Sequence, residues 1–263
     1  HTTHYGPFRP SYFDTPKFTI FNEKGGVGKT TITANLGLGL SLRGMKVLLV
    51  DFDPKGNLTD YFLDKNPIKR SPFEKIYDRD FIYDHIVKVR KDLFVLPATR
   101  SLYDFDKLNG SSNRTDSDTS SIHYFSNVFK HLRFDYILID TLPTFGHLTL
   151  NAIDFTKQIV VPVSMTHWAY KSLLELDEKI FTFTTEGRIY KIIPNMYDNI
   201  TTVSKMIHAL LVSSFGPAVT NTTIPKRVIL EKLSAESKTI YDTAPNDEVA
   251  DAFRDLSREF LIK

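Results

Sequence analysis

The sequence predicts an α/β protein with a doubly wound, mainly parallel sheet and helices on both of its faces. Short runs of β-branched or apolar residues alternate along the chain with longer amphipathic stretches, which is typical of βαβ units. Several runs, such as VLLVD and YILID, are apolar at nearly every position, as in strands that are covered on both sides. A glycine-rich turn follows the first run and leads into a helical pattern. This order of strand, loop and helix favours a ligand site at the carboxyl edge of the sheet.

Length and composition limit the class of protein. The chain has 263 residues, 41% of them hydrophobic, which is enough for one sizeable core, so we expect residues 17–263 to form a single domain. The lack of cysteine excludes disulfides, iron–sulfur clusters and cysteine nucleophiles. No apolar run of about 18 residues is present, so we expect no membrane span or signal peptide and a cytoplasmic protein. The net charge of +2 is too small to indicate a nucleic-acid partner by itself.

Seven short β-branched or apolar runs are predicted as strands. They are residues 17–22, 46–51, 93–96, 136–140, 158–163, 188–194 and 219–224. The first helix is predicted over residues 29–43, where Gly44 follows as a left-handed stop. Gly37 and Gly39 inside this helix are expected to let it lie close to the sheet. The C-terminal stretch NDEVADAFRDLSREFLIK, residues 246–263, is expected to form the last helix and to pack on the core.

Two segments have the composition of irregular structure. Residues 1–16 contain three prolines and are predicted to form a mobile N-terminal tail. Residues 109–121, NGSSNRTDSDTSS, are nearly all small or polar and are predicted to form a surface loop within the domain.

The stretch TIFNEKGGVGKTTITANLG, residues 19–37, predicts a phosphate-binding loop. A strict pattern has glycine six positions before the lysine of Gly-Lys-Thr, where this chain has Glu23. The backbone N–H groups from Gly25 to Thr30 are nevertheless expected to surround phosphates at the start of a helix. Lys29 is expected to reach the β- and γ-phosphates, and the Thr30 hydroxyl to bind Mg²⁺. The predicted nucleotide-binding residues of the loop are Lys24, Gly25, Gly26, Val27, Gly28, Lys29, Thr30 and Thr31.

Carboxylates follow two of the predicted strands. The second strand ends in DFDPKGN, which places Asp51 and Asp53 at the carboxyl edge of the sheet. We expect Asp53 to orient a water toward the γ-phosphate, and Asp51 to help hold Mg²⁺. The run FDYILID ends in Asp140, an acidic residue suited to orienting the metal through water.

Four stretches carry a resemblance to a known family: KGGVGKTT, VLLVDFDPKGN, FDYILIDTLPTFGHLTLNAI and VVPVSMTHWAYKSLLEL. Together they resemble the ParA family of P-loop NTPases with a deviant Walker A motif, which segregate plasmids and chromosomes. The likeness runs from Lys17 to Phe260. It implies a dimer that forms on ATP, with two nucleotides between the subunits.

The resemblance also implies roles for single residues. Lys24 matches the signature lysine that crosses to the partner's phosphates, and a second ammonium near the γ-phosphate would couple ATP to assembly. Lys29, Thr30, Asp53 and Asp140 match the phosphate lysine, the Mg²⁺ ligand, the water-positioning aspartate and the Walker B aspartate. The regions of Asn195 and Pro225 match segments near adenine. The implied cofactors are ATP and Mg²⁺.

The evidence for a DNA partner is local. Residues 188–238 contain seven Lys or Arg against three acids. The segment TIPKRVILEKLSAES resembles one that binds DNA non-specifically in the family, which assigns phosphate contacts to Lys226 and Arg227. A solvated basic rim is the alternative. The family also implies a ParB-like centromere-binding partner and an association with the nucleoid.

The chain departs from the family at several positions. Ile200 stands where some members have a basic residue, Lys55 replaces a glutamine, and Leu142 replaces a proline. About sixteen residues precede the first strand, so the helix-turn-helix domain of longer members is not expected, nor is operator binding.

Three other readings stay open. A MinD-like positioning ATPase needs a terminal amphipathic helix with a basic face, but the C-terminal helix is acidic. A metabolic ligase on the same scaffold needs a small-molecule pocket, whereas a nitrogenase-type reductase is excluded by the lack of cysteine. An interaction module that no longer hydrolyses ATP is disfavoured by the presence of Asp53.

Overall fold

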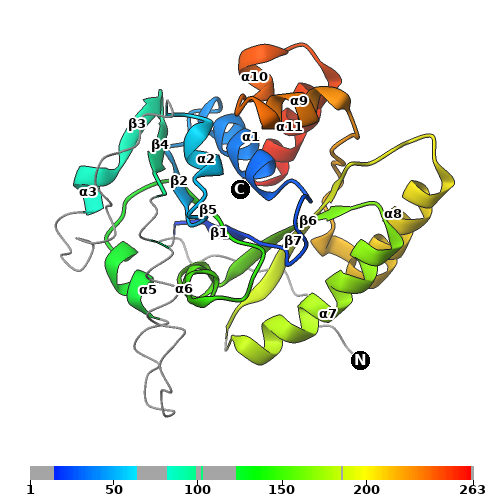
Figure 1. The fold of residues 1–263 in the computed structure, drawn as a ribbon, viewed down its shortest axis with the longest axis horizontal. Helices are drawn as coiled ribbons and strands as arrows, with labels where there is room; N and C mark the ends of the chain where they lie inside the picture. The colour runs from blue at the N-terminus through cyan, green and yellow to red at the C-terminus, as the bar shows by residue number, and fades with distance from the viewer. Residues whose placement is uncertain (1–14, 64–81, 99–101, 103–122, 185, 262–263) are drawn as a thin grey trace.

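The computed structural model describes residues 15–63, 82–98, 102, 123–184 and 186–261. These residues form a seven-stranded sheet with the order β3-β4-β2-β5-β1-β6-β7 (Figure 1). Among the described strands, only β3 pairs antiparallel with its neighbour. The strands are β1 (Lys17–Ile20), β2 (Val47–Asp51), β3 (Val87–Arg90), β4 (Leu93–Leu96), β5 (Tyr136–Asp140), β6 (Gln158–Ser164) and β7 (Arg188–Asn195). The prediction of a doubly wound, mainly parallel sheet is confirmed.

Helices cover both faces of this sheet. Figure 1 shows α1, α9, α10 and α11 on one side and α5, α6 and α7 on the other. The described helices are α1 (Lys29–Ser41), α2 (Asn57–Asp60), α3 (Ile82–His85), α5 (Tyr124–Phe129), α6 (His147–Thr156), α7 (His167–Phe183), α8 (Thr202–Phe215), α9 (Val228–Ala235), α10 (Ile240–Thr243) and α11 (Glu248–Glu259). No helix in the described part of the chain is long and apolar enough to span a bilayer.

Successive residues of the central strands point to opposite layers. Leu49 and Leu138 pack in one cluster with α1 and α11, whereas their neighbours Leu48 and Ile137 pack in another with α5 and α6. This alternation explains why both strands are apolar throughout. The sheet is thereby buried on both faces.

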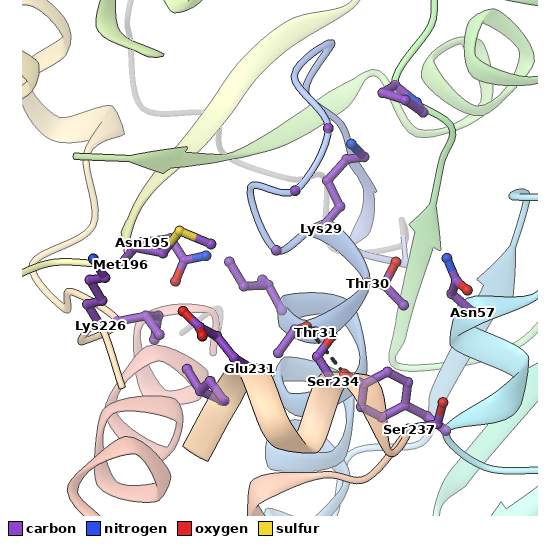
Figure 2. Close-up of a pocket in the computed structure, with 18 of the residues that line it drawn as sticks. Lys29, Thr30, Thr31, Asn57, Asn195, Met196, Lys226, Glu231, Ser234 and Ser237 are labelled. Atoms are coloured by element: carbon purple, nitrogen blue, oxygen red, sulfur yellow. Dashed lines mark hydrogen bonds between the residues drawn. The ribbon is translucent and has the colours of Figure 1, made fainter. Parts of the chain in front are cut away.

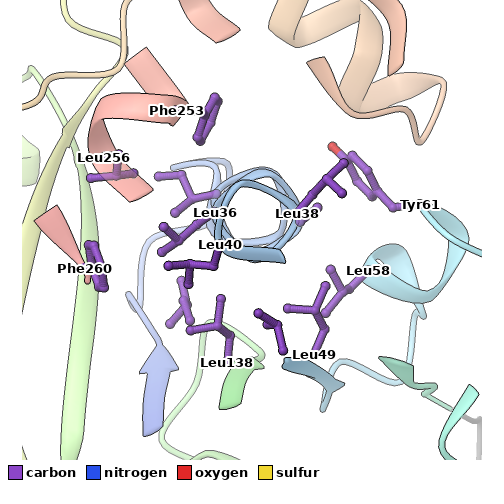
Figure 3. Packing of buried hydrophobic residues seen from close by; sticks show 14 of the residues in the cluster. Leu36, Leu38, Leu40, Leu49, Leu58, Tyr61, Leu138, Phe253, Leu256 and Phe260 are labelled. Atoms are coloured by element: carbon purple, nitrogen blue, oxygen red, sulfur yellow. The ribbon is translucent and has the colours of Figure 1, made fainter. Parts of the chain in front are cut away.

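The last described helix, α11, packs against α1 as predicted. Phe253, Leu256 and Phe260 lie beside α1 and are at most 1% exposed (Figure 3). Burial of one such side chain stabilises the fold by about 1.5–3 kcal/mol. The apolar face of α11 is thus part of the core that supports the phosphate loop.

Two glycines of α1 have different neighbours. A Cβ at Gly37 would lie 2.4 Å from Leu49 Cδ2 on β2, so the expected close approach to the sheet is confirmed there. A Cβ at Gly39 would instead meet the Tyr241 hydroxyl at 2.6 Å and Ser257 Cβ at 3.2 Å. The expectation for Gly39 is therefore wrong. The lack of a side chain at Gly39 makes room for Tyr241 of α10 and Ser257 of α11, and not for the sheet. The helix ends at Ser41, and Gly44 has the expected positive φ of 83°.

One predicted strand is wrong. Residues 219–224 form no strand. The segment is linked to β7 and its end through isolated bridges, Ile192 with Val219 and Tyr197 with the following Pro225, and through a hydrogen bond from the Ile224 N–H to the Pro194 carbonyl at 2.8 Å. The backbone N–H groups of Asn221 and Thr222 donate to the Glu259 carboxylate at 2.9 and 2.6 Å. A side chain of α11 therefore binds two successive N–H groups of this segment, one of which a regular ladder with β7 would have used.

Strand β3 was not predicted. Two of its four residues are charged, and it alternates half-buried and exposed positions. Such a pattern suits an edge strand that presents lysine and arginine to water.

Most of the predicted irregular structure lies outside the described residues. The loop at residues 109–121 lies there entirely, as do residues 1–14 of the predicted tail. Thr15 and Pro16, however, are joined to the domain. Thr15 Oγ1 donates to the Phe134 carbonyl at 2.9 Å, and the Pro16 carbonyl accepts from the Ile137 N–H at 3.0 Å.

Candidate nucleotide-binding site

The loop between β1 and α1 depends on two glycines with left-handed backbone conformations. Gly26 and Gly28 have φ of 72° and 86°, which residues with a Cβ rarely adopt. A Cβ at Gly28 would also lie 2.5 Å from Asn195 Nδ2. Glycine is therefore required at position 28 both by the backbone and by the space available.

The start of α1 is suited to an anion. Gly28 is its N-cap and provides no side-chain hydrogen bond, and the first turn contains no acidic residue. The first N–H groups of a helix have no partner within the helix and carry partial positive charge. This helix end can therefore receive phosphate oxygens.

Lys29 is folded back over the loop. Its residue is 9% exposed, and Nζ donates to the carbonyls of Asn22 at 3.0 Å and Lys24 at 3.3 Å. Burial lowers the pKa of Lys29, while the nearby Asp140 and Asp53 oppose this shift. A buried ammonium that is bonded only to carbonyls can bind a polyanion, which would supply the negative charge it lacks.

Asp140 lies at the end of β5 and contacts the loop. Its Oδ2 accepts from Thr30 Oγ1 at 2.6 Å, whereas Oδ1 is buried and has no hydrogen-bond partner among the described residues. Burial raises the pKa of Asp140 to about 7, although the Thr30 hydrogen bond and Lys29 oppose the shift. A divalent cation here would be compatible with the unpartnered oxygen and would favour the carboxylate.

Asp51 is the register partner of Asp140 on β2. It accepts hydrogen bonds from the Thr59 N–H and hydroxyl at 2.8 and 2.7 Å and from the Asp53 N–H at 3.1 Å. Burial and then the repulsion by Asp140 raise the pKa of Asp51 to about 8. Its hydrogen bonds hold the turn from β2 to α2, so both oxygens already have protein donors.

No group of three or more His, Asp or Glu side chains among the described residues converges to hold a metal alone. This fits Mg²⁺, which proteins commonly bind through one or two side chains together with waters and phosphates. Thr30 and Asp140 are the pair whose geometry suits it.

Asp53 lies beside the loop and lines the cavity described below. It is 8% exposed, and Oδ1 accepts from the Lys55 N–H at 3.0 Å. The tight turn that follows, with Gly56 at φ 71°, leads into α2. Asp53 is thus held at the carboxyl edge of the sheet, close to Lys29.

A cavity of about 490 Å³ opens beside the loop (Figure 2), a size suited to a small ligand. Figure 2 shows Lys29, Thr30 and Thr31 on one side, Asn195, Met196 and Lys226 on another, and α9 below them. The predicted residues that line it are Gly25, Gly26, Gly28, Lys29, Thr30, Thr31, Asp53, Asn195, Pro225, Lys226 and Arg227.

The other predicted residues lie around the cavity without lining it. Val27 is buried beneath the loop, and its carbonyl accepts from Asn195 Nδ2 at 2.8 Å. The Lys24 N–H donates to Asn22 Oδ1 at 2.9 Å. The Lys24 side chain is half-buried, and its ammonium forms no hydrogen bond or ion pair with the described residues. Asp51 and Asp140 lie below the loop.

Several site residues were not predicted. Asn22 is buried and fixes the loop, because Nδ2 donates to the Pro162 carbonyl at 2.8 Å. Thr31 Oγ1 lies 3.2 Å from the Tyr61 hydroxyl and 3.3 Å from Ser234 Oγ. Asn22 could have been noted at the end of the first strand, but nothing local marks Tyr61 or Ser234.

Comparison with known proteins places the chain in a family. A family model described as AAA domain matches residues 16–192. The chain is 30% identical over 251 residues to the chromosome-partitioning ATPase Soj of Thermus thermophilus, covering 94% of this chain and 96% of that one.

Two solved structures share the fold. The putative plasmid partition protein from Borrelia burgdorferi bound to AMPPNP has a TM-score of 0.74 and 22% identity, with 94% of this chain and 98% of that chain covered. Cobyrinic acid a,c-diamide synthase from Mycobacterium smegmatis with bound ADP and magnesium also has a TM-score of 0.74, with 23% identity and 93% of each chain covered. The fold is thus shared with a metabolic enzyme, and the sequence relationship decides the family. The chain belongs to the ParA family of partition ATPases.

Proposed function

We propose that this protein is a Mg²⁺-dependent ATPase that segregates DNA, forms an ATP-sandwich dimer and binds DNA non-specifically. A centromere-binding, ParB-like partner would stimulate its hydrolysis, and the protein would associate with the nucleoid. The observation that carries the proposal is that two lysines of one loop, Lys24 and Lys29, have different surroundings. Lys29 faces its own cavity, whereas Lys24 does not line it.

The loop and Lys29 fit the triphosphate of ATP. The open N–H groups at the start of α1 and the buried ammonium of Lys29 supply donors at one end of the cavity. Thr30 and Asp140 would hold Mg²⁺, and the unpartnered Asp140 Oδ1 supports this assignment. When bound, Mg²⁺ neutralises charge on the phosphate oxygens. We assign Asp51 a supporting role, because its oxygens already bind Thr59 and Asp53.

Asp53 is the residue that we propose orients the attacking water. It lines the cavity near Lys29 and has one oxygen bound to the Lys55 N–H. A carboxylate held in this way can accept a proton or a hydrogen bond from water in a fixed direction. Removing it should slow hydrolysis and leave the nucleotide site in place.

Lys24 would act across the dimer. Its backbone is fixed by Asn22, while its ammonium has no partner among the described residues. An ammonium without a partner gains most where it meets dense negative charge, such as the γ-phosphate of a second subunit. Loss of that phosphate would remove this contact and loosen the dimer.

Lys226 is the better candidate of the two proposed DNA contacts. It is exposed, and its N–H donates to the Tyr197 carbonyl at 2.8 Å, which fixes its backbone next to the cavity. Arg227 forms an ion pair with Glu248, so its charge is already partly neutralised. Contacts of this kind would be to DNA phosphates and would weaken with salt.

The proposal is tested by DNA binding with ATP, ADP or no nucleotide, on the native protein and on Lys29→Ala and Asp53→Ala variants. We expect the native protein to bind DNA only when ATP is present. Lys29→Ala should not bind DNA in response to ATP, and Asp53→Ala should remain bound to DNA when ATP is added. Binding that is the same in all three nucleotide states would reject the proposal. Unchanged hydrolysis by Asp53→Ala would reject the role of Asp53.

A further inference from the structure

The wall of the cavity formed by α9 carries a carboxylate, Glu231. Glu231 is exposed, and it forms no ion pair with any described residue, whereas Lys232 and Lys238 pair with Glu236. A carboxylate beside a triphosphate would be repelled by it. Since Glu231 lines the cavity, its carboxylate gains most if it faces a part of the nucleotide that donates hydrogen bonds.

The two ends of the cavity are distinguished by their chemistry. The phosphate end is marked by Lys29 and the start of α1. Further from the loop, the wall is lined by apolar groups that suit a base, namely Met196, Ile224, Pro225, Leu230 and Phe253. Asn195 lies between this part and the loop, because its amide donates to the Val27 carbonyl. Because ribose joins phosphate to base, the wall between these ends faces the sugar.

Glu231 belongs to that middle wall. Ser234, one turn further along α9, lies 3.3 Å from Thr31 Oγ1 at the end of the phosphate loop. Figure 2 shows Glu231 pointing from α9 toward the side of Asn195 and Lys226, with Thr31 on its other side. The carboxylate thus lies between the phosphate end and the base end.

The helix that carries Glu231 is held at both ends. Arg227, its N-cap residue, forms an ion pair with Glu248 on α11. Ser234, near its end, is joined to Thr31, whose hydroxyl also contacts Tyr61. Leu233 of the same helix is 2% exposed and packs in the core cluster. Helix α9 is therefore anchored to the core and contacts the start of α1, which limits where Glu231 can reach.

We propose that Glu231 accepts hydrogen bonds from the ribose hydroxyls of the nucleotide and so selects ribonucleotides over nucleotides that lack these hydroxyls. This inference rests on the proposed function, since it takes a nucleotide to occupy the cavity. The two carboxylate oxygens match the two O–H donors of a vicinal diol. A carboxylate that binds a ribose hydroxyl is a known solution in dinucleotide-binding folds.

The test compares the binding of ATP and 2′,3′-dideoxy-ATP by calorimetric titration of the full chain. Hydrogen bonds to a charged group give an expected preference for ATP of about tenfold in the native protein. Glu231→Ala should bind both nucleotides equally, with the affinity for ATP reduced to that for the dideoxy form. Glu236→Ala is the matched control, because Glu236 lies at the end of the same helix and pairs with Lys238 outside the cavity.

The outcomes separate this inference from the proposed function. Equal binding of the two nucleotides by the native protein would overturn the ribose contact and leave the ATPase proposal intact. A preference that persists in Glu231→Ala would also overturn it. If Glu231→Ala instead lost a preference for ATP over inosine triphosphate, Glu231 would contact the base and not the ribose, which would overturn the inference. A native protein that binds no nucleotide would reject both proposals.

Discussion

Glu23 and Lys179 form an ion pair, with 2.8 Å between the carboxylate and the ammonium, that joins the phosphate loop to α7. Glu23 stands where a strict phosphate-loop pattern has glycine. Its φ is not positive, whereas Gly26 and Gly28 have positive φ. The curvature of the loop therefore comes from the later glycines, and the loop does not require glycine at position 23.

The first prediction concerns this ion pair. Its side chains are 33% and 43% exposed, and ion pairs at such positions contribute little to stability. Glu23→Gln and Lys179→Ala should therefore retain the affinity for ATP and the melting temperature of the native protein, as measured by calorimetry. A loss of affinity of about tenfold or more in both variants would show that the pair positions the loop.

Lys24→Ala should separate nucleotide binding from assembly. The Lys24 ammonium does not line its own cavity, so the variant should bind ATP with near-native affinity. It should stay monomeric when ATP and Mg²⁺ are added, which light scattering after size-exclusion chromatography would measure. Lys91→Ala, in an exposed turn before β4, removes the same charge and should dimerise normally. A Lys24→Ala protein that dimerises like the native one would contradict the role across the interface.

Gly28→Ala should damage the site far more than Gly25→Ala. At position 28 the backbone is left-handed and a Cβ would lie 2.5 Å from Asn195 Nδ2, whereas a Cβ at Gly25 meets no atom within 4 Å. We expect Gly28→Ala to cost about 1 kcal/mol or more of unfolding free energy and to lose ATP binding. Denaturant unfolding and nucleotide titration would measure both effects. Equal affinities of the two variants for ATP would contradict the strained geometry at Gly28.

Acid should weaken the contact between α5 and α6 through Asp154. Burial by itself raises the pKa of Asp154, but hydrogen bonds from Lys157, Ser126 and His123 outweigh burial and hold it below its ordinary value. The unfolded state then binds more protons in acid, so stability from this group is present at neutral pH and is lost as the pH falls below about 4.

Asp154→Asn should accordingly reduce the free energy of unfolding at pH 7 by about 1–3 kcal/mol, with a smaller loss near pH 3. Urea unfolding at the two pH values would measure this. Asp255→Asn is the control, because the ion pair of Asp255 with Arg258 is exposed and should contribute less than about 1 kcal/mol. A loss in Asp154→Asn that is the same at both pH values would contradict the assignment.

Much of the fold could be predicted from the sequence, since its signals are local. The apolar strands at residues 136–140 and 158–163 coincide with β5 and with most of β6. Residues 219–224, VTNTTI, are mainly β-branched and so were predicted as a strand, but the Glu259 carboxylate accepts hydrogen bonds from two of their N–H groups. Strand β3 was missed for the opposite reason, because its charged residues suit an edge that only the assembled sheet defines.

The sequence by itself determined the part of the site that we propose binds phosphates. Its residues, Gly26, Gly28, Lys29 and Thr30, lie close together in the chain, and their proposed roles follow from backbone conformation and from the start of one helix. Tertiary structure alone decided the rest. Asn195 meets Val27 across 168 positions, and Ser234 meets Thr31 across 203. Such contacts depend on how α9 and β7 pack against α1, which no local pattern specifies. The resemblance pointed to the regions of Asn195 and Pro225, but the part of the wall formed by α9 was visible only in the folded chain.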